Sequence, residues 1–221
     1  MIETEELGVS GIRVLQDAEL YRFTSDSVLL AKFARVKAGD VVADFCSGSG
    51  VVGFYLYGRE PSAVKSVTFF ELQKPLYDLS VKSIELNGLG EKFSAVNTGL
   101  QDIDKSYYGK FSLIVCNPPY MEKTSGAHDK DPSVAICRRE VALDLKELIS
   151  AIGKALKYGG RTALVHRADR LADVICVMRE NGIEPKKIQF CHAEGKDPYL
   201  FLIEGVKGGK SGVKVLSPVK N

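Results

Sequence analysis

The feature that most constrains the fold is a glycine-rich turn that directly follows an apolar strand. A strand is predicted at residues 41–46, the turn is Ser-Gly-Ser-Gly at residues 47–50, and a helix is predicted from about Val51. Glycine lets the backbone approach a ligand closely, because it carries no side chain and adopts positive φ angles. A strand, a tight glycine turn and a helix in this order predict an α/β unit that binds a nucleotide at the turn.

Predicted strands alternate with predicted helices along most of the chain. Further strands are predicted at residues 67–71, 93–96, 111–116 and 161–166, and further helices at residues 75–87, 143–156 and 168–180. This alternation favours a doubly wound α/β fold with a mostly parallel sheet. The last strands, at residues 188–192 and 199–204, are joined by too little chain for a parallel crossover, so an antiparallel terminal hairpin is expected. The prediction is one seven-stranded sheet.

The chain length of 221 residues suits one domain rather than two. We expect residues 1–35 to form an amino-terminal cap segment and residues 205–221 to form a basic tail. The polar stretch at residues 121–132 has neither a helical nor a strand period. It is therefore predicted to be a loop after the fourth strand, in the position of a lid.

Charge and cysteine usage bound the class of protein. Lys plus Arg number 30 and Asp plus Glu number 28, so total charge does not indicate a nucleic-acid binder. The amino terminus is acidic and the last 40 or so residues are rich in lysine, which permits a polyanion to dock there, although solubilising surface lysines explain the pattern equally well. No CxxC pair, clustered histidine, long apolar run or signal peptide is present. A cytoplasmic monomer without a metal site or membrane segment is expected.

The glycine turn is compatible with more than one nucleotide. Glu71 ends the next predicted strand, where a carboxylate can bind both hydroxyls of a ribose. A dehydrogenase would place a pyrophosphate at the helix amino terminus, but the carboxylate of Asp44 beside the turn would repel it. S-adenosylmethionine has no phosphate and carries a cationic sulfonium. The turn therefore favours this cofactor over a dinucleotide, with a purely structural turn as the third interpretation.

The tetrapeptide Asn117-Pro118-Pro119-Tyr120 follows the fourth predicted strand, at the same edge of the sheet. The Asn117 side-chain oxygen and the Pro118 carbonyl can accept the hydrogens of a planar amine, which draws its nitrogen towards tetrahedral geometry. The prolines stiffen the strand exit, and Tyr120 can stack on a base. A strand-ending turn is the alternative. In combination with the glycine turn, the tetrapeptide predicts methyl transfer to an exocyclic amine by in-line displacement.

On these motifs the chain resembles the class I, NPPY-type amino-methyltransferases. It is most similar to the bacterial tRNA adenine-N6 methyltransferases that modify the adenine beside the anticodon of a valine tRNA. The resemblance also includes FTSDSVLLA at residues 23–31, Arg139-Glu140, and LIEGVKGG at residues 202–209, so it covers nearly the whole chain. It implies a Rossmann-like methyltransferase fold, S-adenosyl-L-methionine as cofactor and tRNA as partner.

The resemblance also implies roles for particular residues. Asn117, Pro118, Pro119 and Tyr120 would contact the target base. Separately, the basic charge of the tail predicts that Lys207, Lys210 and Lys214 bind RNA. The cofactor would be bound by Asp44, Gly48 and Gly50 at its methionine part, by Glu71 at its ribose, and by a further set made of Thr24, Asp26, Cys46, Asp102 and Asn117.

Two of these assignments have alternatives. Ser25 or Asp26 could instead cap the predicted helix that begins there. Related enzymes usually carry an acid after the third strand to bind the adenine of the cofactor, but Gly99 stands at that place. Asp102 could substitute for this acid, or the backbone NH of Leu100 could bind the adenine.

The sequence is also compatible with other functions. A protein-glutamine N5 methyltransferase uses the same tetrapeptide, but such enzymes usually carry an amino-terminal helical domain, and only about 40 residues precede Asp44 here. A DNA adenine methyltransferase would need a separate target-recognition region. A non-catalytic RNA-binding module could retain the fold, although the intact NPPY tetrapeptide and glycine turn argue against it.

Overall fold

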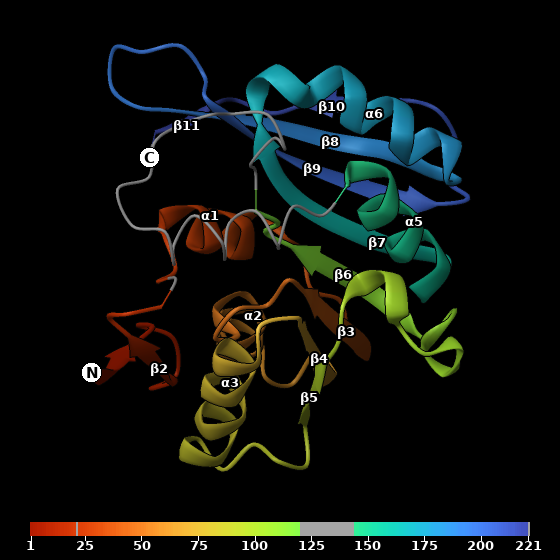
Figure 1. The fold of residues 1–221 in the computed structure, drawn as a ribbon. Helices are drawn as coiled ribbons and strands as arrows, with labels where there is room; N and C mark the ends of the chain where they lie inside the picture. The colour runs from red at the N-terminus through yellow and green to blue at the C-terminus, as the bar shows by residue number, and fades with distance from the viewer. Residues whose placement is uncertain (21, 120–143, 221) are drawn as a thin grey trace.

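The computed structural model describes residues 1–20, 22–119 and 144–220 and has a twisted sheet covered by helices on both faces (Figure 1). The central strands β3 (Asp40–Phe45), β4 (Val64–Glu71), β5 (Phe93–Asn97), β6 (Phe111–Cys116) and β7 (Leu156–Arg167) are parallel. Strands β8 (Ile183–His192) and β9 (Leu200–Lys207) form the antiparallel hairpin. The predicted doubly wound α/β fold is confirmed.

Within the described residues the sheet has nine strands, in the order β10-β8-β9-β7-β6-β3-β4-β5, with β11 also paired to β8. The two strands that the sequence did not predict are β10 (Lys214–Val215) and β11 (Val219–Lys220), which both pair with β8 in parallel. Strands of two residues show no period, so nothing in the sequence marks them. Residues 205–221 are therefore not a separate tail, because they begin inside β9 and return to the sheet.

Strand β7 begins earlier than predicted. Gly159 and Gly160 were expected to end a helix and precede the strand, but they lie inside β7, which starts at Leu156. The pairing with β6 is irregular there, since Phe111 faces Leu156 and Leu113 faces Arg161. Gly159 has a φ of 74°, which suits a glycine in a bulged strand.

Side chains that alternate along the strands build two cores. One face packs against α1 (Ser25–Phe33), α2 (Val51–Arg59) and α3 (Lys74–Leu86), and the other against α5 (Leu145–Ala155) and α6 (Leu171–Glu180). In β3, for example, Val42 faces the first core and Ala43 and Phe45 face the second. Burial on both faces explains why these strands read as continuous apolar runs.

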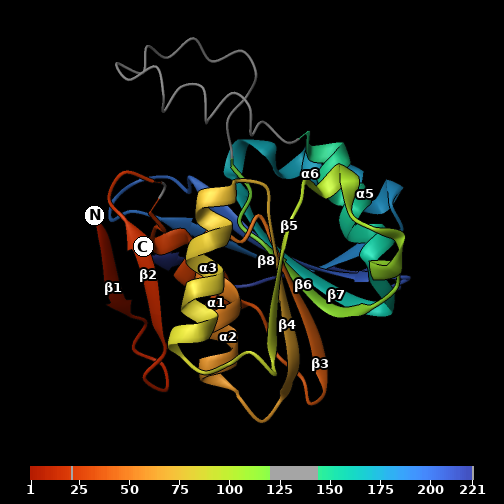
Figure 2. The same ribbon diagram turned by 60° about the horizontal axis from the view of Figure 1, so that its bottom comes forward.

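The amino-terminal segment is a hairpin followed by α1. Strands β1 (Ile2–Glu6) and β2 (Arg13–Asp17) form a separate antiparallel sheet that lies beside α3 (Figure 2). The backbone NH of Leu15 donates to Ser83 Oγ at 2.9 Å, and that of Arg13 donates to Asn87 Oδ1 at 3.0 Å. The hairpin is thus fixed to the helix that precedes β5. Among the described residues, no helix is long and apolar enough to cross a membrane.

Candidate functional site

The glycine turn lies at the carboxyl end of β3, and its glycines have different structural roles. Gly50 has a φ of 89°, and a Cβ there would come within 2.7 Å of the Phe69 ring, so close packing requires a glycine. Gly48 has a φ of 55°, and a Cβ there would meet nothing within 4 Å. Cys46 also has a positive φ, at 55°, which is uncommon for a residue with a side chain. The turn is held in a conformation that leaves the Gly48 side open.

Several backbone amides at the turn donate to carboxylate or carbonyl oxygens. Gly48 N donates to Glu71 Oε2 at 2.8 Å, and Gly53 N, in the first turn of α2, donates to Asp44 Oδ2 at 2.9 Å. Gly50 N donates to Ser47 O at 2.8 Å. A pyrophosphate would find these amides occupied and two carboxylates beside them. The arrangement disfavours a dinucleotide and suits a ligand that carries positive charge.

Both carboxyl groups are buried, and burial shifts the pKa of each upwards. Asp44 is 1% exposed, and its Oδ1 has no hydrogen-bond partner within the described part of the chain. Burial raises the pKa of Asp44 well above its ordinary value, and burial also raises the pKa of Glu71 against the opposing hydrogen bonds from Gln73 and Gly48. Asp44 lies beneath the turn, not at its surface, so in this structure it shapes the turn through Gly53.

Asn117 directly follows β6, and a hydrogen bond fixes its side chain. Its Nδ2 donates to Ser27 Oγ at 2.9 Å, and Ser27 is a buried residue in the first turn of α1. Because Cys116 pairs with Phe45 across the sheet, Asn117 and Cys46 leave neighbouring strands at the same level. The tetrapeptide and the glycine turn therefore meet at one edge of the sheet, as predicted from their places after parallel strands.

Part of the predicted site lies outside the described residues. Pro118 is buried and Pro119 is half-buried, while Tyr120, Arg139-Glu140 and the loop predicted at residues 121–132 belong to the undescribed stretch.

Cys46 is half-buried, and its thiol lies against the thiol of Cys116, whose pKa is raised well above its ordinary value mainly by burial.

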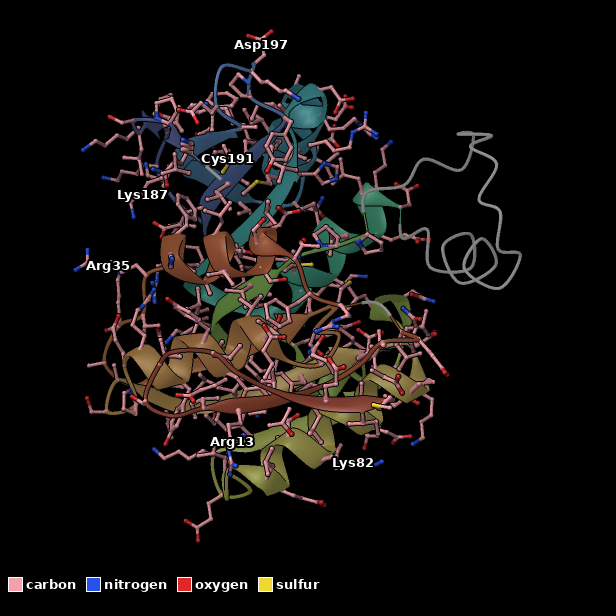
Figure 3. The ribbon with its side chains drawn as sticks, turned by 90° about the vertical axis from the view of Figure 1, so that its left-hand side faces the viewer. Arg13, Arg35, Lys82, Lys187, Cys191 and Asp197 are labelled. Atoms are coloured by element: carbon pink, nitrogen blue, oxygen red, sulfur yellow. The ribbon has the colours of Figure 1, made fainter. Side chains whose placement is uncertain are left out.

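Thr24 and Asp26 lie at the start of α1, on the same edge of the sheet as Asn117. Thr24, and not Ser25 or Asp26, is the residue at the N-cap position of α1, and the Thr24 side chain makes no capping hydrogen bond. The Asp26 carboxyl is half-buried, and this burial raises its pKa. Asp26 also lies near Cys191 of β8 and contributes to raising the pKa of that thiol to about 11. Cys191 lies inside the molecule in Figure 3.

Asp102, considered as a substitute for the acid that binds the adenine of the cofactor in related enzymes, is not buried. Asp102 ends a 3-10 helix, η1 (Leu100–Asp102), with its side chain exposed. Gly99 is buried, and a Cβ there would come within 2.8 Å of the Gln101 side chain. Asn97 instead supports the neighbouring strand, because its Nδ2 donates to the backbone oxygens of Glu71 at 2.8 Å and Leu72 at 2.9 Å. The role of Asp102 stays a prediction.

Of the three lysines predicted to bind RNA, Lys207 lies away from the edge that holds Asn117. Cys116 pairs with Leu164, which pairs with Ile203, and Lys207 lies four residues further along β9 in the opposite direction from Asn117. This separation is roughly 13 Å along the strand. Lys207 Nζ donates to the backbone oxygen of Leu156 at 2.8 Å, so its ammonium is already engaged. Lys214 is exposed on β10, and Lys210 is exposed in the preceding loop.

Sequence reasoning missed three polar residues at the site. Gln16, which is 1% exposed, donates from Nε2 to Ser49 Oγ and so ties the amino-terminal hairpin to the glycine turn. Ser27 accepts a hydrogen bond from Asn117. His166 lies one residue before the end of β7, where burial lowers its pKa to about 4. A single Gln, Ser or His inside an otherwise apolar element has no pattern by which to recognise it.

Comparison with known proteins places these motifs in a family. The family described as "Methyltransferase small domain" matches residues 23–175. A tRNA1(Val) (adenine(37)-N6)-methyltransferase of Aeromonas hydrophila is 27% identical over 153 residues, which cover 69% of this chain and 62% of that relative. The protein of the same name from Shewanella sediminis is 22% identical, over 81% of this chain and 73% of its own length. The chain thus spans about six tenths of the Aeromonas protein.

Solved structures are similar in fold. A predicted O-methyltransferase from Agrobacterium tumefaciens has a TM-score of 0.67 at 18% identity, covering 88% of this chain and 86% of that one. TYW2 from P. horikoshii, solved in complex with MeSAdo, has a TM-score of 0.65 at 15% identity, covering 94% of this chain and 72% of that one. The resemblance inferred from the glycine turn and NPPY, and the fold that it implied, are confirmed.

Proposed function

Because the chain belongs to the Methyltransferase small domain family, we propose that it is an S-adenosylmethionine-dependent methyltransferase that acts on the N6 amine of an adenine in tRNA. The observation that carries the proposal is the orientation of Asn117. Its side-chain nitrogen donates to Ser27 Oγ at 2.9 Å, and its side-chain oxygen is the acceptor end of the amide, which we propose faces the incoming amine.

The residues around the glycine turn fit the proposed cofactor. The open side of Gly48 provides space for a ligand against the backbone, and Glu71 at the end of β4 has a carboxylate suited to ribose hydroxyls. One oxygen of the buried Asp44 carboxyl has no hydrogen-bond partner among the described residues, and a cationic ligand beside the turn would favour the charged form of this carboxyl. When bound, S-adenosylmethionine supplies an electrophilic methyl group. Thr24, Asp26, Cys46, Gly50 and Asp102 are proposed to complete the cofactor site.

The chemistry of the acceptor follows from the tetrapeptide. An adenine amine is a weak nucleophile, because its lone pair is delocalised into the ring. Asn117 Oδ1 and the Pro118 carbonyl oxygen would each accept a hydrogen bond from the target amine. These two hydrogen bonds would localise the lone pair on the nitrogen for in-line attack. Positioning supplies most of the rate increase, so no strongly basic side chain is needed. Tyr120 is proposed to stack on the extruded base.

The choice of tRNA rests on the relatives, whose printed names describe tRNA1(Val) adenine(37)-N6 methylation. The same acceptor pair could also bind the side-chain amide of a protein glutamine, so a protein-glutamine N5 methyltransferase is the alternative enzyme. We also propose that residues 1–221 act as one domain and as a monomer.

One experiment tests the substrate. RNA from a strain that lacks the gene is digested to nucleosides and compared with parental RNA by mass spectrometry, and the purified protein is then incubated with the deficient RNA and S-adenosylmethionine. We expect N6-methyladenosine to be lost from one tRNA and restored in vitro. Unchanged nucleosides, with methylated glutamine lost from a protein, would favour the glutamine alternative.

Calorimetry separates the enzyme from a non-catalytic RNA-binding module. S-adenosylhomocysteine should bind the protein, whereas NADH should not, because the amides of the turn are occupied. If neither nucleotide bound at millimolar concentration while RNA did, the module interpretation would replace the enzymatic one.

A further inference from the structure

Helix α1 reaches the end of β6 through a hydrogen bond between two side chains. Asn117 Nδ2 donates to Ser27 Oγ at 2.9 Å, although the two residues are 90 positions apart in the sequence. Ser27 is 5% exposed, so water competes little for its hydroxyl. The bond therefore connects the amino-terminal segment directly to the residue that carries the proposed chemistry.

The two ends of the Asn117 amide are chemically different. The oxygen accepts hydrogen bonds and the nitrogen donates them. A target amine offers hydrogens, so only the oxygen can receive it. If the amide were rotated by half a turn, its NH2 group would face the NH2 group of the target, and two donors would meet. With the nitrogen on Ser27, the oxygen is directed to the other side of the amide.

The helix that carries Ser27 is itself held firmly. The guanidinium of Arg59, at the end of α2, donates from Nη1 to Ala31 O at 2.6 Å and from Nη2 to Ala34 O at 2.7 Å. These carbonyls belong to the last turn of α1 and its C-cap. Because α2 begins at the glycine turn, α1 is fixed relative to the proposed cofactor site as well as to Asn117.

We propose that Ser27 is a positioning residue for methyl transfer, which holds the Asn117 amide with its oxygen towards the target amine. This role rests on the proposed function, and it adds a residue that does not touch the substrate. Ser27 acts only through Asn117, so its loss lowers the rate of transfer without changing the affinity for the cofactor.

Variants at α1 test the proposal. Ser27→Ala removes the acceptor, Ser27→Thr retains a hydroxyl, and Ser25→Ala is the matched control, because Ser25 is exposed on the same helix turn. We expect kcat to fall about tenfold or more in Ser27→Ala, with the KM for RNA and the affinity for S-adenosylhomocysteine unchanged. Ser27→Thr should recover most of the rate, and Ser25→Ala should match the parent protein.

A double-variant cycle separates positioning from general damage. In an Asn117→Ala background, Ser27→Ala should have no further effect on kcat, because the group that it positions is gone. If the two losses multiplied, or if Ser27→Thr were as slow as Ser27→Ala, Ser27 would contribute only to packing and the proposal would be overturned.

A measurement without substrate keeps the hydrogen bond testable. The side-chain NH2 resonances of Asn117 are identified by their loss in Asn117→Ala, and their exchange with D2O is then compared in the parent and in Ser27→Ala. Faster exchange in the variant is expected. Equal exchange would show that the bond does not form. If the bond formed but the parent methylated no RNA, the proposed function would fail and the role of Ser27 with it.

Discussion

Asn117 is the side chain whose removal should affect the reaction most directly. We expect Asn117→Ala to reduce kcat by about 100-fold or more, because an acceptor that stabilises developing charge is lost. The affinity for S-adenosylhomocysteine should remain almost unchanged, since Asn117 reaches the target and not mainly the cofactor. Single-turnover kinetics and calorimetry on the same preparation check both expectations. A variant with near-normal turnover would remove Asn117 from the mechanism.

His166 should make folding stability depend on pH. Burial lowers its pKa from 6.5 to about 4, so between these values the unfolded chain binds a proton that the folded protein does not. Stability should therefore rise with pH through this window and be lost as the pH falls from 6.5 towards 4. At pH 5 the loss from this group amounts to roughly 2 kcal/mol.

Urea unfolding at pH 5 and pH 7.5, in the parent and in His166→Gln, measures this contribution. Buried carboxyl groups such as Asp44 act in the opposite direction, because their raised pKa makes stability fall as the pH rises. The variant isolates the histidine, since the carboxyl groups are common to both proteins. An equal change in the unfolding free energy of the two proteins between these pH values would contradict the expectation.

At this scale, motifs predicted the site where chemistry requires a fixed order of residues. Asp44, the glycines and Asn117 could be found because their spacing follows from the strand ends that carry them. Gln16 and Ser27 could not be found, because their partners are distant in the sequence. His166 could not be found, because its lowered pKa is due mainly to burial. Asp102 is an example of the opposite kind. Its place after a predicted strand made it a candidate cofactor-binding residue, but its side chain is exposed.

Among the elements, α2 packs most tightly beneath the site. A Cβ at Gly53 would lie 2.6 Å from Phe69 Cε1 and 2.9 Å from Val67 Cγ1, both on β4. We expect Gly53→Ala to cost roughly 1–3 kcal/mol of unfolding free energy, because the helix must move away from the strand. Gly90→Ala is the control, since a Cβ there meets nothing within 4 Å. Denaturant midpoints compare the two, and equal midpoints would mean that α2 yields without strain.

The elements were predictable where a period extends over several residues. The bounds of β6 agree with the prediction, and α2 begins at the predicted Val51. In both places a run of apolar residues is bounded by a clear turn signal, which is NPPY after β6 and the glycine turn before α2. The start of β7 was missed, since a pair of glycines normally marks a break and here lies in a bulge. β10 and β11 were missed because tertiary contacts, such as Leu216 N donating to Ile188 O at 2.8 Å, and not local pattern, make them strands.

Over the whole molecule, the two edges of the sheet have different tasks. The carboxyl edge holds the glycine turn and Asn117, whereas the amino edge is fastened by a buried ion pair, in which Arg161 Nη2 lies 2.6 Å from Asp40 Oδ2. Ser112 Oγ donates to the other oxygen of Asp40 at 2.7 Å. These contacts join β3, β6 and β7 at the end that faces away from the site.

This division changes what is expected of the predicted RNA-binding lysines. Lys207→Gln should leave RNA binding nearly unchanged, because the ammonium is held by Leu156. Lys210→Gln combined with Lys214→Gln should reduce the slope of log K against log salt by roughly 1.5, since two exposed ammonium groups would no longer displace counterions. Titrations at several salt concentrations measure both. Equal slopes in the pair variant and the parent would exclude these lysines from the RNA surface.

The outer rim of the sheet carries one more consequence. Strand β8 pairs there with the short strands β10 and β11. Two side chains of β8 also bind this last segment of the chain. Lys186 Nζ donates to Lys210 O at 2.9 Å, and Gln189 Nε2 donates to Ser217 O at 2.9 Å. An unpaired rim of this kind is a template on which another chain can add a strand. Because β10 and β11 pair with β8, they leave less of its backbone open to such an added strand.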